Sequence, residues 1–339
     1  MSRYLRQHLS ELVPYSSARQ ESGGAAGIWL DANESPYSSA YNRYPDPRAI
    51  ALREVIAKHA GVECEQVLPA CGSDQLIDMI FRAYCEPGQD TALTFSPGFS
   101  MYDHCAQMND VEMYHMSLDD QYDIHLDRTL TFVRKHAPKI IFLCSPNNPT
   151  GNSLTSDRMV SVAQAADGIV VIDEAYIHYA DAPSLAAQLE DLPNVIILQT
   201  LSKAHGAAGL RLGYAMAATS LLDDLRKVKL PYDLSSMVSD TAVQIIKSTT
   251  QLHQQIAETI SERKRLRTCL ENLPEVVQIY PSDANFLLVR FLDHRKVYTQ
   301  LRAAGIIVRD RSALVEACLR ITVGVPKEND ILLATLQAI

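Results

Sequence analysis

Four apolar runs in this chain are each followed by polar residues that could take part in acid–base or nucleophilic chemistry. The runs are residues 67–71, 139–144, 168–172 and 194–199. A Gly-Ser-Asp helix start follows the first run, and Asn148, Asp173 and Lys203 follow the other three. If the runs are neighbouring strands, their carboxyl ends meet at one edge of a sheet, where open α/β folds bind ligands. We therefore expect an amide, a carboxylate, a lysine amine and a helix N-terminus to converge on one crevice.

Each of these features has an ordinary structural explanation when it is taken alone. A lysine is usually solvated, an Asp after a strand often caps a turn, Asn-Pro pairs are common in turns, and Gly-Ser-Asp is a plain helix start. Together, however, they match the needs of pyridoxal phosphate (PLP). A lysine amine condenses with its aldehyde, an Asp keeps its pyridine nitrogen protonated, and its phosphate favours a helix N-terminus and a cation.

Further residues near these positions would complete such a site. Arg211, eight positions after the lysine, is a candidate cation for the phosphate, beside the backbone N–H groups of Ser73 and Asp74. Asn148 and Tyr176 offer donors for the phenolic oxygen of the cofactor. The set predicts a PLP site at the carboxyl edge of the sheet.

The order of the elements predicts an α/β fold. From about residue 50, strand-like runs alternate with helical patterns, which is typical of parallel strands joined by crossover helices. Near residue 235 the pattern changes to a long, charge-rich helix, whose charges favour a solvated face, and then to fewer strands that include antiparallel ones. The predicted parts are an N-terminal arm, a large PLP-binding domain and a small α+β domain. Their predicted bounds are residues 1–40, 41–235 and 236–339.

Composition excludes several classes of protein. The 339 residues carry a net charge of −9, and this acidic balance argues against nucleic-acid binding, which needs a basic surface. No apolar run reaches the length of a membrane span, and the first residues carry scattered charges instead of a signal core. The seven cysteines form no C-x-x-C pair and predict reduced thiols. We expect a cytoplasmic enzyme of small molecules.

Several motifs give the chain a resemblance to fold-type I PLP aminotransferases. They are S-P-N-N-P-T-G (145–151), D-E-A-Y (173–176), T-L-S-K (200–203) and A-G-L-R-L-G (208–213). Within that superfamily the chain resembles the histidinol-phosphate aminotransferase family through further segments. These are V-P-Y-S-S-A-R (13–19), L-D-A-N-E (30–34), N-R-Y-P (42–45), C-E-P-G (85–88), I-I-V-R-D (306–310) and C-L-R-I-T-V-G (318–324). The resemblance implies a mostly parallel seven-stranded sheet between helices and a smaller C-terminal domain.

The resemblance also implies a reaction and a role for each matching residue. L-histidinol phosphate and 2-oxoglutarate would exchange with imidazole-acetol phosphate and L-glutamate, with Lys203, Asp173 and Tyr176 as catalytic residues. The implied cofactor-binding residues are Ser73, Asp74, Phe99, Asn148, Asp173, Tyr176, Thr200, Ser202, Lys203 and Arg211. Tyr44 would reach the cofactor phosphate of a neighbouring subunit, so the resemblance implies a homodimer. The implied substrate-binding residues are Tyr15, Asn148, Arg309 and Arg320.

The substrate assignment is the least determined part of this hypothesis. Arg320 stands where related enzymes hold a carboxylate, and a phosphate dianion needs the additional donors of Arg309 and Tyr15. The two arginines could instead pair with surface carboxylates, and Tyr15 could pack the arm. Aromatic amino-acid aminotransferases and threonine-phosphate decarboxylases share the fold, and a PLP-binding regulator without turnover is a further alternative.

Neither the histidines nor a pair of glycines near Lys203 indicate a further ligand. His104 and Cys105 are adjacent but lack metal-ligand spacing, and His178 is interpreted as a packing residue. His205 stands two positions after the lysine, where the family more often has an aromatic residue. The glycines at 206 and 209 lack the third glycine and the acidic residue of a dinucleotide site. We therefore predict no metal and no cofactor other than PLP.

Overall fold

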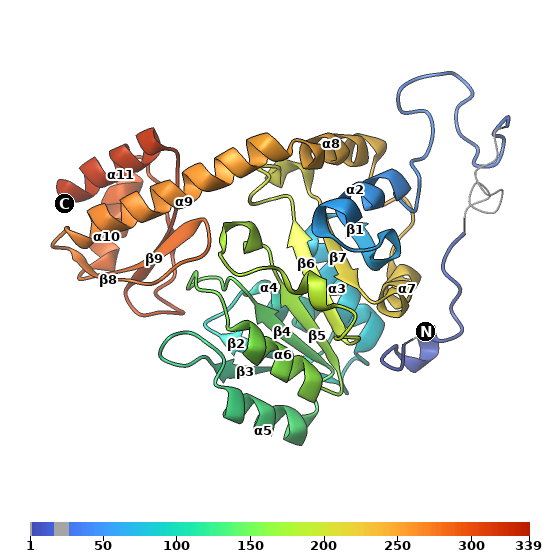
Figure 1. Cartoon of the computed structure of the whole chain (residues 1–339), viewed down its shortest axis with the longest axis horizontal. Helices are drawn as coiled ribbons and strands as arrows, with labels where there is room; N and C mark the ends of the chain where they lie inside the picture. Colours follow the sequence, from blue (N-terminus) through green and yellow to red (C-terminus); the bar gives the residue numbers. More distant parts are fainter. Residues whose placement is uncertain (1, 17–26) are drawn as a thin grey trace.

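The chain folds around two β-sheets, in a computed structural model that describes residues 2–16 and 27–339 (Figure 1). The larger sheet has seven strands in the order β1-β7-β6-β5-β4-β2-β3. The strands are β1 (Val67–Ala70), β2 (Thr91–Ser96), β3 (Glu112–Ser117), β4 (Ile140–Cys144), β5 (Ile169–Asp173), β6 (Val195–Thr200) and β7 (Gly213–Ala217). Only β7 runs antiparallel to its neighbours, β1 and β6. The predicted α/β fold with a mostly parallel seven-stranded sheet is confirmed.

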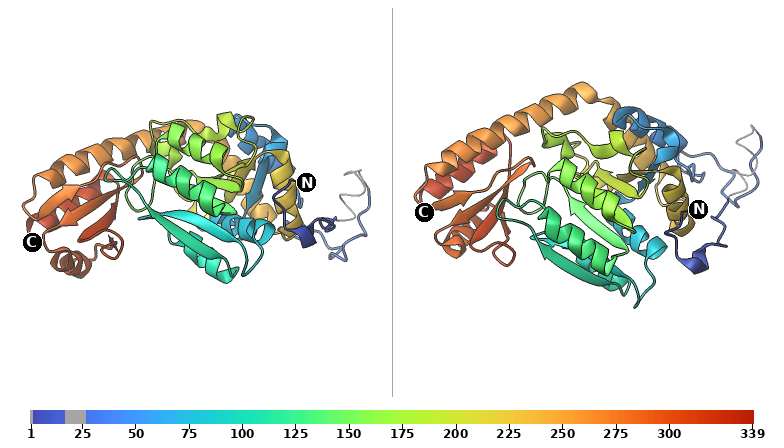
Figure 2. Two further views of the ribbon diagram at one scale, coloured as in Figure 1. Left: turned by 90° about the horizontal axis from the view of Figure 1, so that it is seen from below. Right: turned by 60° about the horizontal axis from the view of Figure 1, so that its bottom comes forward.

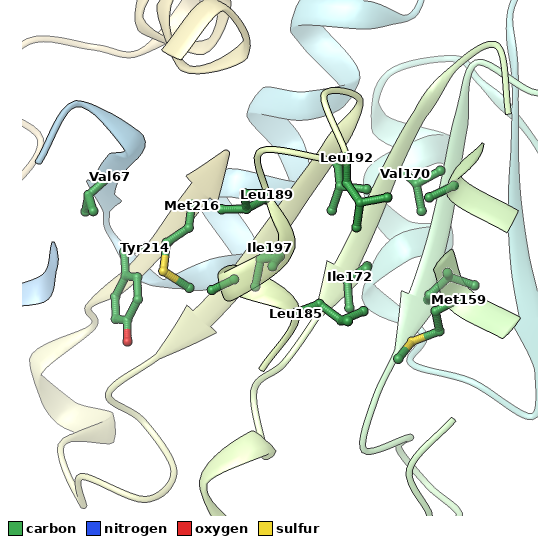
Figure 3. Close-up of a cluster of buried hydrophobic side chains, with 14 of the residues drawn as sticks. Val67, Met159, Val170, Ile172, Leu185, Leu189, Leu192, Ile197, Tyr214 and Met216 are labelled. Carbon is green, nitrogen blue, oxygen red and sulfur yellow. The ribbon is translucent and has the colours of Figure 1, made fainter. Parts of the chain in front are cut away.

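Helices cover both faces of this sheet because its strands are apolar on both sides. The helices of this part are α2 (Ile50–Ala60), α3 (Gly72–Tyr84), α4 (Met101–Met108), α5 (Leu126–His136), α6 (Ser156–Ala165), α7 (Thr219–Val228) and α8 (Ser236–Lys247). Alternate strand residues such as Ile141, Val170 and Ile197 pack with α2, α5, α6 and α8. Figure 3 shows Val170, Ile197 and other side chains of this cluster. The intervening residues, such as Phe142 and Val171, pack with α3, α4 and α7.

The smaller sheet belongs to the C-terminal part of the chain. Its four strands lie in the order β10-β11-β9-β8, and every pair is antiparallel. The elements are α9 (Thr249–Glu271), β8 (Val276–Ile279), β9 (Phe286–Phe291), α10 (His294–Ala303), β10 (Arg309–Asp310), β11 (Cys318–Thr322) and α11 (Pro326–Gln337). The long helix α9 runs from α8 to this smaller domain (Figure 1). The domain bounds stay a prediction. Because α8 shares the core of the large sheet, the packing favours a boundary between the large and the small domain that lies within α9.

Short 3-10 helices occupy several of the connections. They are η1 (Gln7–Leu9), η2 (Cys64–Gln66), η3 (Ile177–Tyr179), η4 (Leu185–Gln188) and η5 (Ala208–Leu210). Two of them lie next to predicted site residues, because η3 follows Tyr176 and η5 precedes Arg211.

The charged stretch of α9 is less solvated than its sequence predicted. Arg263 is buried, and its Nη1 donates hydrogen bonds to the carbonyl oxygens of Ala284, at 2.7 Å, and Tyr179, at 3.4 Å. Periodicity could not reveal this, because the acceptors come from a loop of the small domain and from η3. The helix therefore ties the small domain to the segment that follows Tyr176.

The described parts of the N-terminal arm lie at the end of the molecule opposite to the C-terminus (Figure 2). Between residues 27 and 49 the arm contains no helix or strand. Large apolar side chains are exposed along it, at Leu12, Val13, Tyr15, Ile28, Leu30, Tyr37, Tyr41 and Tyr44. Such an apolar strip is typical of a surface that another chain covers. The predicted V-P-Y-S-S-A-R segment lies partly outside the described residues.

Two expectations from composition can be compared with the structure. All seven cysteines are free, and four of them are buried, which agrees with the predicted thiols. In the part of the chain that the structure describes, no helix has the length and apolar composition needed to cross a membrane.

Replacing Arg263 by alanine tests the link that α9 makes between the two domains. The variant leaves the Ala284 carbonyl without its charged donor, so we expect the free energy of unfolding to fall by about 1.5–3 kcal/mol. Urea unfolding of wild type and variant measures this difference. Arg267→Ala, on the same helix, is the matched control, because its exposed ion pair with Glu271 contributes less than about 1 kcal/mol. Equal losses in the two variants would contradict the assigned role.

Candidate active site

One cavity of about 260 Å³ lies at the carboxyl edge of the large sheet. Most of the predicted site residues line it: Ser73, Asp74, Phe99, Asn148, Asp173, Tyr176, Thr200, Ser202, Lys203, Arg211 and Arg320. The remaining lining residues are Cys144, Ala175, Ala208 and Arg311. The convergence expected from the sequence is therefore observed, with one wall of the cavity contributed by the small domain.

Sheet topology explains why these side chains meet. Asp173 is the last residue of β5 and Thr200 the last of β6, and these strands are parallel neighbours. Asn148 follows β4, which pairs in parallel with β5. Strand β1 is antiparallel to β7, which is antiparallel to β6, so β1 points the same way as β6 and delivers the N-terminus of α3 to the same edge.

Asp173 is a buried carboxylate at one side of the cavity. Its Oδ2 accepts a hydrogen bond from the hydroxyl of Tyr102 at 2.8 Å, and its Oδ1 accepts one from the amide of Ala175 at 3.1 Å. Burial raises the pKa of Asp173, while the two hydrogen bonds and the nearby amine of Lys203 work in the opposite direction. A cationic group within the cavity would therefore be stabilised by this carboxylate, and would in turn keep it ionised.

Lys203 supplies the amine of the same cavity. Its Nζ lies 5.4 Å from the centre of the Tyr176 ring. Burial lowers the pKa of Lys203, and the positive charge of Arg320 lowers it further, against the opposing effect of Asp173. A lowered pKa increases the fraction of neutral amine, which is the nucleophilic form.

The N-terminus of α3 forms a concave cradle with Arg211. Gly72 has a φ of +78°, and a Cβ there would lie 2.7 Å from the Arg211 guanidinium. A Cβ on Gly213 would lie 2.4 Å from the amide nitrogen of Ser73. Only glycine at both positions allows β7 and the arginine to approach the helix end this closely. The resulting combination of free helix N–H groups and a guanidinium is a site for a phosphate.

Hydroxyl groups complete the edge of this cradle. The hydroxyl of Thr200 donates to the Leu212 carbonyl at 3.1 Å and accepts from the Ser202 amide at 3.1 Å. Nη1 of Arg211 lies 3.5 Å from the Ser202 hydroxyl, and its Nη2 lies 3.4 Å from Oδ2 of Asp74. The hydroxyls of Thr200 and Ser202 and the guanidinium of Arg211 therefore lie together at one end of the cavity.

Three arginines of the small domain crowd the opposite side. Arg320 on β11 donates to Oδ1 of Asn148 at 2.5 Å and stands directly across from Arg309 on β10. Burial lowers the pKa of Arg320 and of Arg311, and the neighbouring guanidinium groups lower both further. Nε of Arg311 is buried without a hydrogen-bond partner, and among residues 2–16 and 27–339 none of the three arginines pairs with a carboxylate. This concentration of positive charge favours an anion.

Three predicted residues do not line the cavity. Arg309 is exposed and lies beside Arg320, one strand away from the lining. Tyr15 and Tyr44 lie on another surface, where the ring of Tyr44 stacks on Tyr232 with centroids 4.6 Å apart. Tyr15 meets the same Tyr232 ring edge-on at 6.4 Å. Within one chain, neither tyrosine is in a position to contact the ligand of this cavity.

Two residues next to the site were missed from the sequence. Tyr102 is on α4, and no local signal relates it to Asp173, which lies 71 positions further along the chain. Arg311 directly follows the I-I-V-R-D segment, two positions after Arg309, and side chains two apart in an extended chain point to the same side. That periodicity was the available signal for Arg311, whereas only the fold could reveal Tyr102.

Comparison with known proteins agrees with this geometry. The family model of aminotransferase class I and II matches residues 28–336. The histidinol-phosphate aminotransferase of Parabacteroides distasonis is 44% identical over 335 residues, which cover 98% of this chain and 97% of that protein.

Two solved structures are similar in fold. That of the histidinol-phosphate aminotransferase of Sinorhizobium meliloti in complex with pyridoxal-5'-phosphate has a TM-score of 0.81 at 24% identity and covers 100% of this chain and 97% of that one. That of the L-threonine-O-3-phosphate decarboxylase of Porphyromonas gingivalis has a TM-score of 0.74 at 22% identity, covering 87% and 92%. These similarities show the shared fold. With the full-length relative, they place the chain in the aminotransferase class I and II family and, within it, in the histidinol-phosphate aminotransferase family.

Proposed function

We propose that this protein is a PLP-dependent aminotransferase that interconverts L-histidinol phosphate and 2-oxoglutarate with imidazole-acetol phosphate and L-glutamate. The observation that carries the proposal is the placement of Lys203 and Asp173 in one cavity, between a phosphate cradle and a cluster of arginines. Family membership at 44% identity over nearly the full length supports the same substrate. The reaction belongs to histidine biosynthesis.

The residues of the cavity fit PLP at both ends of the molecule. The cradle between α3 and Arg211 suits its phosphate, and the glycines that a Cβ would obstruct keep the cradle open. Asp173 would hold its pyridine nitrogen, Phe99 would stack on its ring, and Asn148 and Tyr176 would donate to its phenolic oxygen. Bound there, PLP supplies an electron sink for the substrate carbon that loses its proton.

Lys203 is the proposed carrier of both the cofactor and the proton. Its lowered pKa supplies the neutral amine for attachment, and the same amine, once displaced by the substrate amine, would accept the proton of the substrate carbon and deliver it to the carbon of PLP that carried the aldehyde. Burial raises the pKa of Asp173, and the hydrogen bonds from Tyr102 and the amide of Ala175 oppose that rise and so favour its charged form. Because one lysine in one cavity serves both half-reactions, amino donor and 2-oxo acid must bind in turn, as in ping-pong kinetics.

The arginine cluster supports a phosphorylated substrate. A phosphate dianion accepts more hydrogen bonds than a carboxylate, and Arg320 already uses one N–H on Asn148. Arg311, with its unpartnered Nε, is positioned to supply the additional donors, and Arg309 adds positive charge directly across from Arg320. The same guanidinium groups can hold the carboxylate of 2-oxoglutarate in the second half-reaction.

We also propose a homodimer, located in the cytosol, in which Tyr44 reaches the cofactor phosphate of the partner and Tyr15 reaches the partner's substrate. In support, both tyrosines are exposed on an apolar arm and lie away from the cavity of their own chain. A second chain that covers the arm would bury this apolar surface and bring aromatic hydroxyls to the open side of the site.

Substrate comparison tests the proposed function. Wild-type holoenzyme should convert its bound cofactor to the amine form with histidinol phosphate faster than with phenylalanine, and without releasing carbon dioxide from threonine phosphate. Arg311→Met should lower kcat/KM for histidinol phosphate by about 10–100-fold, because a charged hydrogen bond to the phosphate is lost, and should affect phenylalanine much less. Arg309→Met, two positions earlier in the chain and outside the lining, should lose less. Preference for phenylalanine, or carbon dioxide release, would replace the proposal by one of the alternatives.

A phenylalanine at position 102 tests how Asp173 is kept ionised. The Tyr102 hydroxyl lowers the pKa of Asp173 against the effect of burial, so removing it should move the acid limb of the kcat/KM profile up by about one to two pH units. As the pH falls, the variant should therefore lose activity at a higher pH than wild type does. Tyr84→Phe is the matched control, since the buried Tyr84 donates to the Leu221 carbonyl at 3.0 Å, away from the site. An unshifted acid limb in Tyr102→Phe would contradict this role.

Hybrid dimers test the exchange of residues between subunits. Lys203→Ala and Tyr44→Ala should each be nearly inactive as homodimers, the first because the amine is lost and the second because the cofactor phosphate loses a donor. Equal mixing after reversible dissociation should restore about a quarter of wild-type activity, because half of the dimers then contain one intact site. Failure to restore activity, although mixed dimers form, would place Tyr44 outside the partner's site.

A further inference from the structure

Three histidines that the proposed reaction does not use come together beside the loops of Lys203 and Tyr176. His59 lies in the last turn of α2, His178 in η3, and His205 in the segment after β6. One ligand nitrogen from each ring can be chosen so that all three lie within 4.8 Å of one another. The ring centres of His178 and His205 are 5.0 Å apart, and His59 is 6.1 and 5.8 Å from them.

The hydrogen bonding of these rings is incomplete. His205 is only 9% exposed, yet neither of its ring nitrogens has a hydrogen-bond partner within the described chain, and Nδ1 of His178 also lacks one. Burial, with the neighbouring imidazoles, lowers the pKa of His178 to about 4 and that of His205 to about 3. Burial also lowers the pKa of His59. The unpartnered nitrogens of His178 and His205 are therefore available to a ligand.

We propose that His59, His178 and His205 form a binding site for a divalent transition metal ion, with Zn²⁺ as the best match. Three imidazoles plus a water are a common tetrahedral zinc environment, with zinc–nitrogen distances of about 2.0–2.1 Å. Tetrahedral ligands at that distance lie about 3.3 Å apart, so rotation of the side chains must bring the nitrogens closer than the 4.8 Å that bounds them here. The C-terminal end of α2, where His59 lies, carries the negative pole of the helix dipole and favours a cation.

The position of the site indicates what the metal would do. His178 is two residues after Tyr176 and His205 is two residues after Lys203, so one ion would fasten both segments to α2. The amide of Gly206 already donates to the Lys203 carbonyl at 3.0 Å, which keeps this segment folded back on itself. The metal would therefore position and stabilise the segments, without contact with the reacting atoms. The sequence predicted no metal because the three ligands come from distant segments with no motif spacing.

Zinc binding to the untagged holoenzyme tests the proposal, after chelator treatment and removal of free PLP, which itself binds zinc. Equilibrium dialysis with ZnCl₂ should give one Zn²⁺ per chain with micromolar or tighter affinity, and Zn²⁺ should raise the Tm of the holoenzyme. His59→Gln should weaken binding by at least about 100-fold, because loss of an outer-shell partner alone costs about 10–100-fold. His104→Gln, at an exposed histidine of α4, should bind as wild type does.

Two further measurements separate a loss of zinc binding from misfolding, and neither of them depends on enzyme activity. Circular dichroism and the visible spectrum of bound PLP establish that His59→Gln is folded and loaded, and His178→Gln provides a second ligand variant. Co²⁺ at the site should give the intense visible ligand-field bands of a tetrahedral ion, absent from both variants. Wild-type protein that binds no Zn²⁺ in excess metal, or variants that bind it as tightly as wild type, would overturn the proposal.

Discussion

The site depends on a carboxylate that the fold holds away from water. Asp173 ends a central strand, so the sheet that makes its backbone rigid also removes its solvent. Burial raises its pKa, and the folded chain without a bound cation therefore loses stability as the pH rises through that raised pKa. The hydroxyl of Tyr102 and the Ala175 amide recover part of this cost. A protonated pyridine nitrogen beside Asp173 would stabilise its charge further, so burial of this carboxylate favours binding of a cationic ring.

The site also depends on contact between the large and the small domain. The segment after β4 is held by the small domain, because the amide of Ser153 donates to Asp283 at 3.0 Å and the amide of Asp283 donates to the Gly151 carbonyl at 2.7 Å. Gly151 has a φ of +92°, and a Cβ there would lie 2.6 Å from the Ser282 hydroxyl. This close docking brings Arg320 onto Asn148. Asn148, which is proposed to bind the cofactor, is therefore oriented by Arg320, which is proposed to bind the substrate.

Most of the fold and much of the site could be predicted from the sequence, because apolar runs mark the strands and the polar residues that follow them mark the site. Lys203, Asp173 and Asn148 each follow an apolar run, and parallel pairing places such positions at one edge. Tyr102 could not be predicted, since its contact depends on how α4 packs across the sheet. Arg263 was expected in solvent because charge alone does not reveal buried carbonyl acceptors.

The arginine cluster shows how the two half-reactions can share one cavity. With no carboxylate partner among the described residues, Arg311 and Arg320 repel each other. Burial lowers the pKa of Arg311, and this repulsion lowers it further. An anion that enters relieves the repulsion and gains charge-assisted hydrogen bonds at the same time. Histidinol phosphate and 2-oxoglutarate differ in shape, but both carry an anionic group close to the reacting carbon, a phosphomethyl group in the first and a carboxylate in the second. The same guanidinium groups can therefore serve both substrates in turn, while an aromatic amino acid offers them only a carboxylate, which accepts fewer charge-assisted hydrogen bonds than a phosphate dianion.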